Sequence, residues 1–215
     1  MNIAIIGASG FIGSSLREEA LSRGHTVTGL VGRPERLETR PGLTAQHADV
    51  QKTEALAEQI KGFDAVLSAF SGHAQEDVEG YYTRGFDNIL SAARKAGVKR
   101  LMMVGGAGSL EVAPGIQLID TPEFPSEYKA TAEGARYALN QLRAQDDVAW
   151  TMLSPAAIIA PGERTGSYTL GSHQLLTNTN GESAISVEDY AKAMIDEMEV
   201  PRHENERFTL AYTQE

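Results

Sequence analysis

The sequence contains no cysteine among its 215 residues. This absence excludes disulfide bonds, thiolate catalysis and cysteine-ligated metal sites, and no spacing of histidines or carboxylates suggests another metal site. The chain also lacks a long uninterrupted apolar stretch, so the sequence predicts no membrane-spanning helix. An apolar strand begins with the first residues and leaves no room for a signal peptide, so we expect a cytoplasmic protein.

Positive charge is scarce in this chain. Lys and Arg total 19 against 29 Asp and Glu, which gives a formal net charge of −10. This balance excludes a general affinity for the phosphate backbone of nucleic acids, although a few local arginines can still bind one small anionic ligand. The hydrophobic content of 41% is that of a globular protein rather than a disordered or fibrous one.

A glycine-rich segment follows the first apolar strand. The isoleucine-rich run 2–6 ends at Gly7, and Gly10 and Gly13 follow in a Gly-x-x-Gly-x-x-Gly spacing before helical periodicity begins. Glycines there allow positive φ and remove Cβ atoms that would keep a phosphate from the backbone. The next helix points its free N–H groups and positive dipole end at that phosphate. This order predicts a dinucleotide-binding site; the alternative is an ordinary tight strand-helix turn.

Apolar strands and periodic helices alternate along the rest of the chain. The expected strands are 2–6, 26–31, 43–46, 63–69, 100–104, 148–153 and, at a sheet edge, 208–211. The expected helices run from the glycine turn through 21, over 53–61 capped by Thr53, over 78–93, over 126–142, and over 187–198 capped by Ser186.

This alternation predicts an α/β fold, a doubly wound parallel sheet of the Rossmann type. We expect one domain over residues 1–215. Residues 1–154 form its cofactor-binding core, and 155–215 supply substrate-side loops, the last helix and the edge strand. The tyrosines and the phenylalanine of the helix over 78–93 are expected in the core rather than at the cofactor.

Ligands of such a sheet bind at the carboxyl ends of its strands. The candidate cofactor contacts are Gly7, Ser9, Gly10, Phe11, Ile12, Gly13, Arg33, Asp49, Val50, Ser68, Ala69, Phe70, Gly105, Ser154, Pro155 and Ala156. Asp49 is either a contact near the adenine or a plain turn aspartate. Ser109 is either a catalytic or positioning residue, or a turn cap. His73 is either a proton donor near the cofactor or a solvated loop histidine.

Arg33 follows the second strand, where sites for NAD usually carry a carboxylate that binds the ribose 2′-OH. A guanidinium can instead bind a 2′-phosphate through two parallel hydrogen bonds, so this residue favours NADP, with NAD still possible. The alternative is a solvated loop arginine, since Arg36 and Arg40 lie nearby.

Several segments together resemble the atypical short-chain dehydrogenase/reductases, which have an NAD(P)-binding Rossmann domain. The segments are GASGFIG (7–13), VGGAGSL (104–110), FPSEYK (124–129), WTMLSPA (150–156), GERTG (162–166) and ISVEDYA (185–191). The chain looks most similar to bacterial NADH-flavin reductases, relatives of biliverdin reductase B and the NmrA-like regulators. The resemblance implies an NAD(P)H-dependent reductase that passes hydride to a flavin, a quinone or a similar acceptor. The alternative is a non-catalytic NAD(P) sensor of the NmrA-like type.

The resemblance implies a role for Lys129, but this sequence departs from the family's catalytic motif at one position. Short-chain dehydrogenases carry Tyr-x-x-x-Lys with the tyrosine as proton donor; Lys129 fits the lysine, but Pro125 stands at the tyrosine's position. Tyr128 points about 100° away around the helix and cannot substitute by register. Lys129 is therefore expected at the nicotinamide ribose and in catalysis. Hydride transfer to a flavin needs no such tyrosine, because solvent or a nearby group can protonate the acceptor.

The stretch 161–181 shows no clear period and is expected to form substrate-facing loops. Within it, Glu163 and Arg164 either line the acceptor pocket or form a surface ion pair of small energy. The expected partner is a small-molecule acceptor, with no nucleic acid and no membrane.

Overall fold

The computed structural model describes residues 1–214, which form twelve strands and five α-helices. The strands are β1 (Asn2–Ile6), β2 (Thr26–Val31), β3 (Leu43–His47), β4 (Ala65–Ser68), β5 (Leu101–Val104), β6 (Glu111–Ala113), β7 (Ile116–Gln117), β8 (Trp150–Ser154), β9 (Ile158–Ala160), β10 (Thr169–Gly171), β11 (Ala184–Ser186) and β12 (Glu206–Ala211). The helices are α1 (Phe11–Ser22), α2 (Thr53–Ile60), α3 (Val78–Ala96), α4 (Ser126–Arg143) and α5 (Val187–Glu199).

Eight strands form one sheet in the order β10-β12-β8-β5-β4-β1-β2-β3. Every neighbouring pair is parallel except β10 with β12. Two smaller sheets pair β6 with β7 and β9 with β11. The strand order changes direction between β1 and β4, as in a doubly wound sheet, so the predicted fold class is confirmed.

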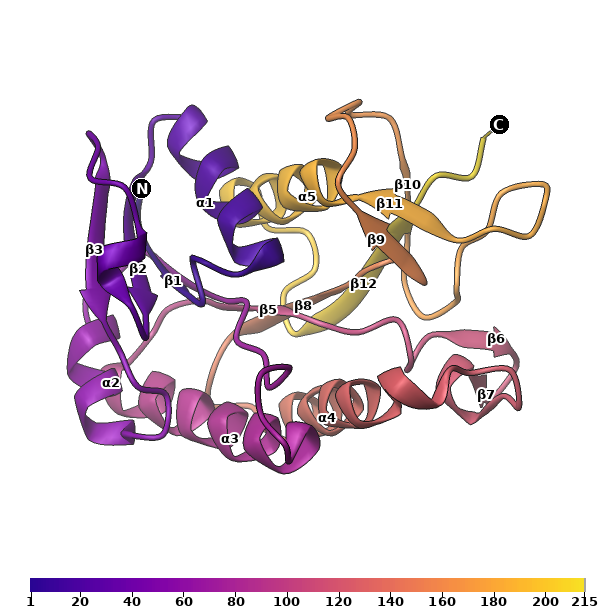
Figure 1. The fold of residues 1–215 in the computed structure, drawn as a ribbon, viewed down its shortest axis with the longest axis horizontal. Helices are drawn as coiled ribbons and strands as arrows, with labels where there is room; N and C mark the ends of the chain where they lie inside the picture. The colour runs from indigo at the N-terminus through magenta and orange to yellow at the C-terminus, as the bar shows by residue number, and fades with distance from the viewer. Residues whose placement is uncertain (215) are drawn as a thin grey trace.

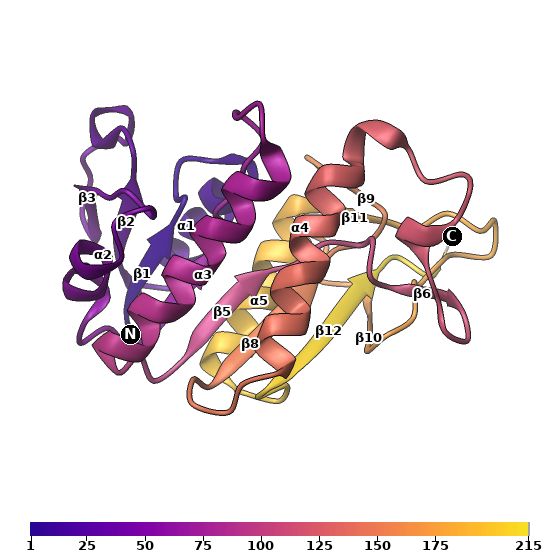
Figure 2. The ribbon, with the colours of Figure 1, turned by 90° about the horizontal axis from the view of Figure 1, so that it is seen from below.

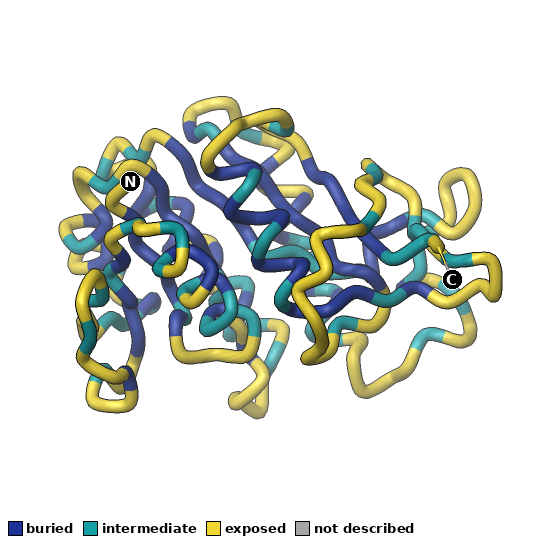
Figure 3. Tube along the Cα trace, turned by 90° about the horizontal axis from the view of Figure 1, so that it is seen from above, coloured by how far each residue is buried: buried dark blue, intermediate teal, exposed yellow. Residues whose placement is uncertain are grey.

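Helices cover both faces of this sheet (Figure 1). Helices α1 and α5 lie on one face, and α2, α3 and α4 lie on the other, where α3 and α4 run side by side (Figure 2). Side chains along β1 alternate between the two layers: Ile3 and Ile5 pack with α1 and α5, whereas Ala4 and Ile6 pack with the opposite helices. The central strands β1, β4, β5 and β8 are accordingly buried, whereas the edge strand β3 and most connecting loops are exposed (Figure 3). None of the helices in residues 1–214 combines the length and apolar character needed to cross a bilayer.

Capping residues account for some of the helix boundaries. Gly97 ends α3 with a left-handed φ of 62°, and at the start of α5 the Asp189 N–H donates to Ser186 Oγ at 3.0 Å. The prediction for Thr53 was wrong. Thr53 is the first residue of α2 rather than its cap, because its Oγ1 donates to Asn88 Oδ1 of α3 at 3.0 Å.

The position of the last strand is a second correction. We expected the strand around 208–211 at the sheet edge, but β12 lies between β8 and β10. The antiparallel edge strand β10 comes from the stretch 161–181, which showed no periodicity. A three-residue strand is too short to display an alternating pattern, and the same holds for β6, β7, β9 and β11.

Candidate functional site

A cleft of about 590 Å³ opens at the carboxyl ends of the central strands. Its walls are the glycine turn after β1, the loops after β4, β5 and β8, and the first turns of α4. These segments meet because β1, β4, β5 and β8 are parallel neighbours in the sheet and end at the same edge.

The cleft brings together some of the predicted cofactor contacts. Those that line it are Gly10, Phe11, Ile12, Ala69, Phe70, Gly105, Pro155 and Ala156. Those that do not line it are Gly7, Ser9, Gly13, Arg33, Asp49, Val50, Ser68, Ser109, Lys129 and Ser154.

The three glycines of the turn have different structural roles. Gly7 has a φ of +78°, and a Cβ added to it would lie 2.8 Å from the Ala69 carbonyl oxygen. A Cβ added to Gly13 would lie 2.0 Å from the Gly7 carbonyl oxygen, so the backbone itself requires glycine at both positions. At Gly10, the nearest atom to an added Cβ is the Gly7 carbonyl oxygen, at an ordinary 3.4 Å.

Gly10 is also the N-cap of α1. This helix has no capping side chain and no acidic residue in its first turn, so N–H groups there remain without a side-chain acceptor. Gly10, Phe11 and Ile12 line the cleft at this point. A helix N-terminus with free N–H groups and no Cβ at its cap fits the pyrophosphate of a dinucleotide.

The residues after β2 and β3 lie away from the cleft lining. Arg33 is exposed, and its side chain makes no hydrogen bond or ion pair within residues 1–214. Asp49 Oδ1 accepts a hydrogen bond from the Gln51 N–H at 2.9 Å, as a turn aspartate does. Val50 is buried in the core. At the end of β4, Ser68 Oγ accepts from the Phe70 N–H at 3.4 Å and thereby shapes the backbone of the following loop.

A second glycine-rich segment, Gly105, Gly106, Ala107 and Gly108, lines the cleft and is termed the glycine floor here. Ser109 and Ser154 are buried behind it and do not line the cleft. Arg207 donates to both hydroxyls from β12, a contact that sequence reasoning missed. The available signal was a charged residue directly before an apolar strand.

Helix α4 presents a different face to the cleft from the one we expected. Tyr128, Thr131, Ala132 and Ala135 line it, at the spacing of one helical face. Lys129 lies about 100° from Tyr128 around the helix, is exposed and does not line the cleft. The structure thus places Tyr128, and not Lys129, in the cleft lining, and the role of Lys129 at the nicotinamide ribose stays a prediction.

Three further side chains in the cleft lining carry ionisable groups, namely His73, Tyr82 and Glu123. His73 Nδ1 lies 3.3 Å from Thr131 Oγ1, which links the loop after β4 to α4. Tyr82 stacks on Phe70 with ring centroids 5.8 Å apart, and burial raises the pKa of its hydroxyl above the usual range. Tyr82 is thus a core residue, as expected, and it also forms part of the cleft wall.

The segment after β9 is fastened to α1 and α5. Arg164 forms two hydrogen bonds of 2.8 Å with the buried Glu19 of α1, so its partner is not Glu163. The buried Asp189 accepts from Thr165 Oγ1 at 2.6 Å and from the Gly166 N–H at 2.8 Å. Burial alone would raise the pKa of Asp189, but these donors outweigh it and lower the pKa. Neither Glu163 nor Arg164 lines the cleft.

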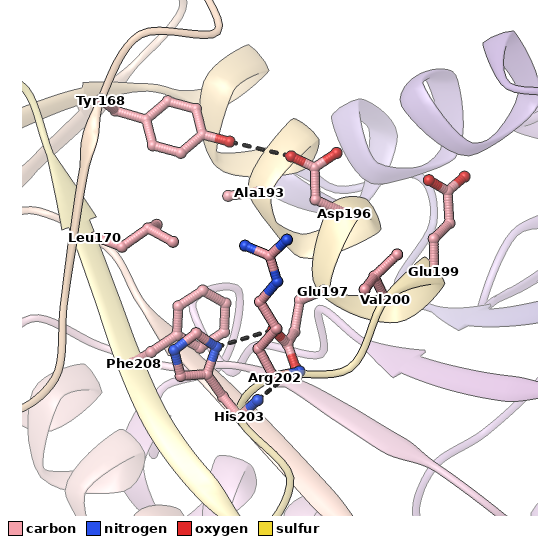
Figure 4. A pocket seen from close by; sticks show the side chains of 10 residues that line it. All are labelled: Tyr168, Leu170, Ala193, Asp196, Glu197, Glu199, Val200, Arg202, His203 and Phe208. Carbon is pink, nitrogen blue, oxygen red and sulfur yellow. Dashed lines mark hydrogen bonds and ion pairs between the residues drawn. The ribbon is translucent and has the colours of Figure 1, made fainter.

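A separate cavity of about 260 Å³ lies between α5, β10 and β12 (Figure 4). The buried Glu197 carboxylate accepts from His203 Nδ1 at 2.8 Å and from Arg100 Nη2 at 2.7 Å. The His203 ring stacks on Phe208 with centroids 4.2 Å apart. Since no lining residue is shared with the cleft, the cavity is structurally distinct from the candidate site.

Comparison with known proteins adds independent findings. A family model described as NAD(P)H-binding matches residues 7–201. The uncharacterized protein YwnB of Bacillus subtilis (strain 168) is 44% identical over 214 residues, which cover 98% of each chain. The structure of a proposed epimerase from Bacteroides thetaiotaomicron is 42% identical with a TM-score of 0.93, covering 100% of this chain and 98% of that one. A proposed NADH-flavin reductase from Streptococcus pneumoniae TIGR4 is 34% identical with a TM-score of 0.87, covering 99% of this chain and 100% of that one.

Proposed function

The chain belongs to the NAD(P)H-binding family, and from that premise we propose that it is an NAD(P)H-dependent reductase of a flavin, a quinone or a similar small acceptor. The supporting observation is the shape and lining of the cleft. Its lining includes the uncapped N-terminus of α1. Three apolar side chains of the lining, those of Phe11, Tyr128 and Ile158, are 51%, 60% and 60% exposed, and the part of the cleft that they line is termed its mouth here. Exposed apolar side chains in the lining of one cleft favour a hydrophobic ligand.

When bound, the nicotinamide supplies the hydride, and the residues of the chain bind and orient it. Gly10 and the N–H groups of Phe11 and Ile12 would hold the pyrophosphate. The glycine floor and Pro155 would form the surface under the nicotinamide. The similarity to a proposed flavin reductase along the whole chain supports this arrangement.

NADP is the proposed cofactor, with NAD as the alternative. The exposed Arg33 guanidinium follows β2 and has no partner within residues 1–214, so it is free to bind a 2′-phosphate. Arg33→Ala should weaken NADPH binding by about 1.5–3 kcal/mol, the contribution of charged hydrogen bonds, and leave NADH nearly unchanged. Fluorescence titration with both nucleotides tests this; equal losses, or a wild-type preference for NADH, contradict the assignment.

Reduction of the acceptor also requires a proton, since the acceptor gains a hydride. Pro125 stands where short-chain dehydrogenases have their tyrosine, so the proton is proposed to come from solvent at the open mouth or from His73. In the tautomer in which His73 Nδ1 accepts from the Thr131 hydroxyl, the ring hydrogen is on Nε2, which can then donate it. Simple ketones and alcohols should therefore turn over negligibly.

The second candidate is a nucleotide sensor that binds NAD(P) without hydride transfer. The absence of the tyrosine and the position of Lys129 outside the cleft lining favour it. Oxidation of NADPH in the presence of a panel of flavins and quinones separates the two. We expect acceptor-dependent oxidation; tight NADPH binding with no rate above the uncatalysed one would establish the sensor instead.

The cytoplasm is the proposed site of action. The cysteine-free composition and the net charge of −10 support a protein that acts there on small molecules, without nucleic acid or membrane partners. Fractionation of cells that express a tagged chain tests the location, with the tag at the C-terminus so that the N-terminal strand stays intact. Recovery in the membrane or exported fraction would contradict it.

A further inference from the structure

Arg207 on β12 is a cation that the chain buries without a counterion. It is 3% exposed, and it forms no ion pair with a carboxylate of residues 1–214. Its Nη1 donates to Ser109 Oγ at 3.2 Å and to Ser154 Oγ at 3.4 Å, and its Nε has no partner in the same part of the chain. Burial of a charge is costly unless the charge is compensated, so packing alone does not account for an arginine here.

The side chain joins segments that are far apart in sequence. Ser109 follows β5, Ser154 ends β8, and the carbonyl oxygen of His173, after β10, lies 3.5 Å from Nη2. The next residue, Phe208, points to the opposite side of the sheet, into the separate cavity of Figure 4. Arg207 therefore faces the α4 side, behind the cleft.

The charged groups that face Arg207 come from three neighbouring elements. Burial lowers its pKa to about 10, repulsion from Arg143 of α4 acts in the same direction, and attraction to Glu111 of β6 opposes both. His173, in the loop that follows β10, is a further titratable neighbour of Arg207. The guanidinium stays charged at neutral pH. Each serine that accepts from it keeps its own hydroxyl hydrogen free to donate.

The two serines connect this charge to both ends of the glycine floor. Ser109 directly follows Gly108, and Ser154 Oγ would lie 3.1 Å from a Cβ added to Gly105. The floor lines the cleft, whereas Arg207 and the serines lie behind it. Arg207 thus bonds to the residue that follows the last glycine of the floor and to a side chain that packs beside its first glycine.

We propose that Arg207 is a positioning residue that fixes the glycine floor against β8 and so sets the affinity for the nicotinamide half of the cofactor. The proposal rests on the proposed function, which places the nicotinamide on this floor. The adenine and pyrophosphate contacts come instead from β2 and the glycine turn, on which Arg207 makes no contact. Loss of Arg207 should therefore weaken the binding of the nicotinamide half of the dinucleotide and leave the binding of the adenine and pyrophosphate part unchanged.

The test compares two nucleotides that differ only in the nicotinamide: NADPH and 2′-phospho-ADP-ribose. Arg207→Met removes the charge and the donors but keeps an apolar stem. It should raise the Kd of NADPH about tenfold and that of 2′-phospho-ADP-ribose less than twofold. Arg207→Lys keeps the charge and should bring the NADPH Kd back to within about threefold of wild type. Arg202→Met is the matched control, because that exposed arginine lies at the separate cavity, and it should change neither Kd.

If Arg207→Met does not fold, Ser109→Ala tests the same link with the buried arginine retained. It should raise the NADPH Kd about threefold and leave 2′-phospho-ADP-ribose unchanged. Equal weakening of both nucleotides, or wild-type NADPH binding by a folded Arg207→Met, would overturn the proposal. These are binding measurements, so a wild-type protein that reduces no acceptor refutes the proposed reductase without affecting this result.

Discussion

The glycine turn before α1 and the glycine floor after β5 line the same cleft but are held in place differently. In the turn, Cβ atoms added to Gly7 and Gly13 would collide with backbone carbonyl oxygens at 2.8 and 2.0 Å. In the floor, an added Cβ on Gly105 would meet Met152 Cγ at 2.8 Å, and one on Gly108 would meet a side-chain methyl at the same distance. The turn is therefore constrained by its own backbone, and the floor by side chains packed against it.

The hydrogen bonds show the same difference. The turn is closed within a few residues: the Gly10 N–H donates to the Gly7 carbonyl at 3.0 Å, and the Ser14 N–H to the Gly10 carbonyl at 2.8 Å. The floor is bonded to more distant segments: the Gly105 N–H donates to the Leu153 carbonyl at 2.8 Å, and the Gly108 carbonyl accepts from the Ile119 N–H at 2.9 Å. Ser109, which follows the floor, accepts from Arg207, 98 positions away. We therefore expect the turn to tolerate no side chain at Gly7 or Gly13, whereas a change in the floor can be compensated by a change in the side chain packed against it.

The strongest test of the turn is Gly13→Ala. One methyl group would lie 2.0 Å from the Gly7 carbonyl oxygen, and neither backbone segment can move without breaking the turn. We expect a loss of about 3 kcal/mol or more in the free energy of unfolding, because overpacking against rigid backbone is not relieved by rotamer changes. Urea denaturation measures it. A loss below about 1 kcal/mol would show that the turn adapts as the floor does.

Gly10→Val should separate folding from binding within the same turn. Gly10 has an ordinary φ of −77°, and an added Cβ meets only the Gly7 oxygen at 3.4 Å, so the fold should lose no more than about 1 kcal/mol. The branched side chain would occupy the space that a phosphate needs at the N-terminus of α1. NADPH affinity should fall at least about 100-fold, or 2.7 kcal/mol. A folded variant that binds like wild type would mean that the turn is only structural.

This contrast also explains what sequence reasoning could and could not predict. The glycine turn was recognisable because strand, turn and helix are consecutive, and caps such as Gly97 and Ser186 act within one helical turn of their own position. Arg207 was missed because its partners lie in other strands, and nothing local marks a buried arginine behind a floor. The edge strand β10 was missed because three residues carry no period.

The face of α4 illustrates an intermediate case. Helical geometry correctly separates Tyr128 from Lys129 by about 100°, but it does not say which of the two faces the cleft. That choice is made by tertiary packing: Ala132 and Ala135 lie against the glycine floor, where added Cβ atoms on Gly108 and Gly106 would meet their methyl groups at 2.8 and 2.9 Å. The family motif predicts that Lys129 faces the cleft, whereas the packing of α4 places Tyr128 there.

A destabilising substitution in the glycine floor should be compensated by a second substitution in α4. Gly108→Ala places a methyl group 2.8 Å from the Ala132 Cβ, so α4 must shift, at an expected stability cost of about 1–3 kcal/mol. Ala132→Gly alone should cost about 1 kcal/mol through helix propensity. Because the second change removes the atom that the first one meets, the double variant should be at least about 1 kcal/mol more stable than the sum of the single losses predicts. Denaturation of all four chains measures this coupling; strict additivity would mean that the floor does not depend on its contact with α4.

The smallest expected effect separates Tyr128 from Lys129. Tyr128 lines the mouth of the cleft and is 60% exposed, so its ring is available to cover an acceptor. Tyr128→Ala should raise the KM for a flavin or quinone about fivefold, or roughly 1 kcal/mol, with kcat nearly unchanged, whereas Tyr128→Phe should keep the ring and the KM. Lys129→Ala is the matched control on the adjacent face and should alter neither parameter by more than about twofold.

If Lys129→Ala instead raises the nucleotide KM and lowers kcat, the role implied by the family motif holds despite the position of the side chain. If Tyr128→Phe removes most of the activity, the hydroxyl is the proton donor, and solvent and His73 are not.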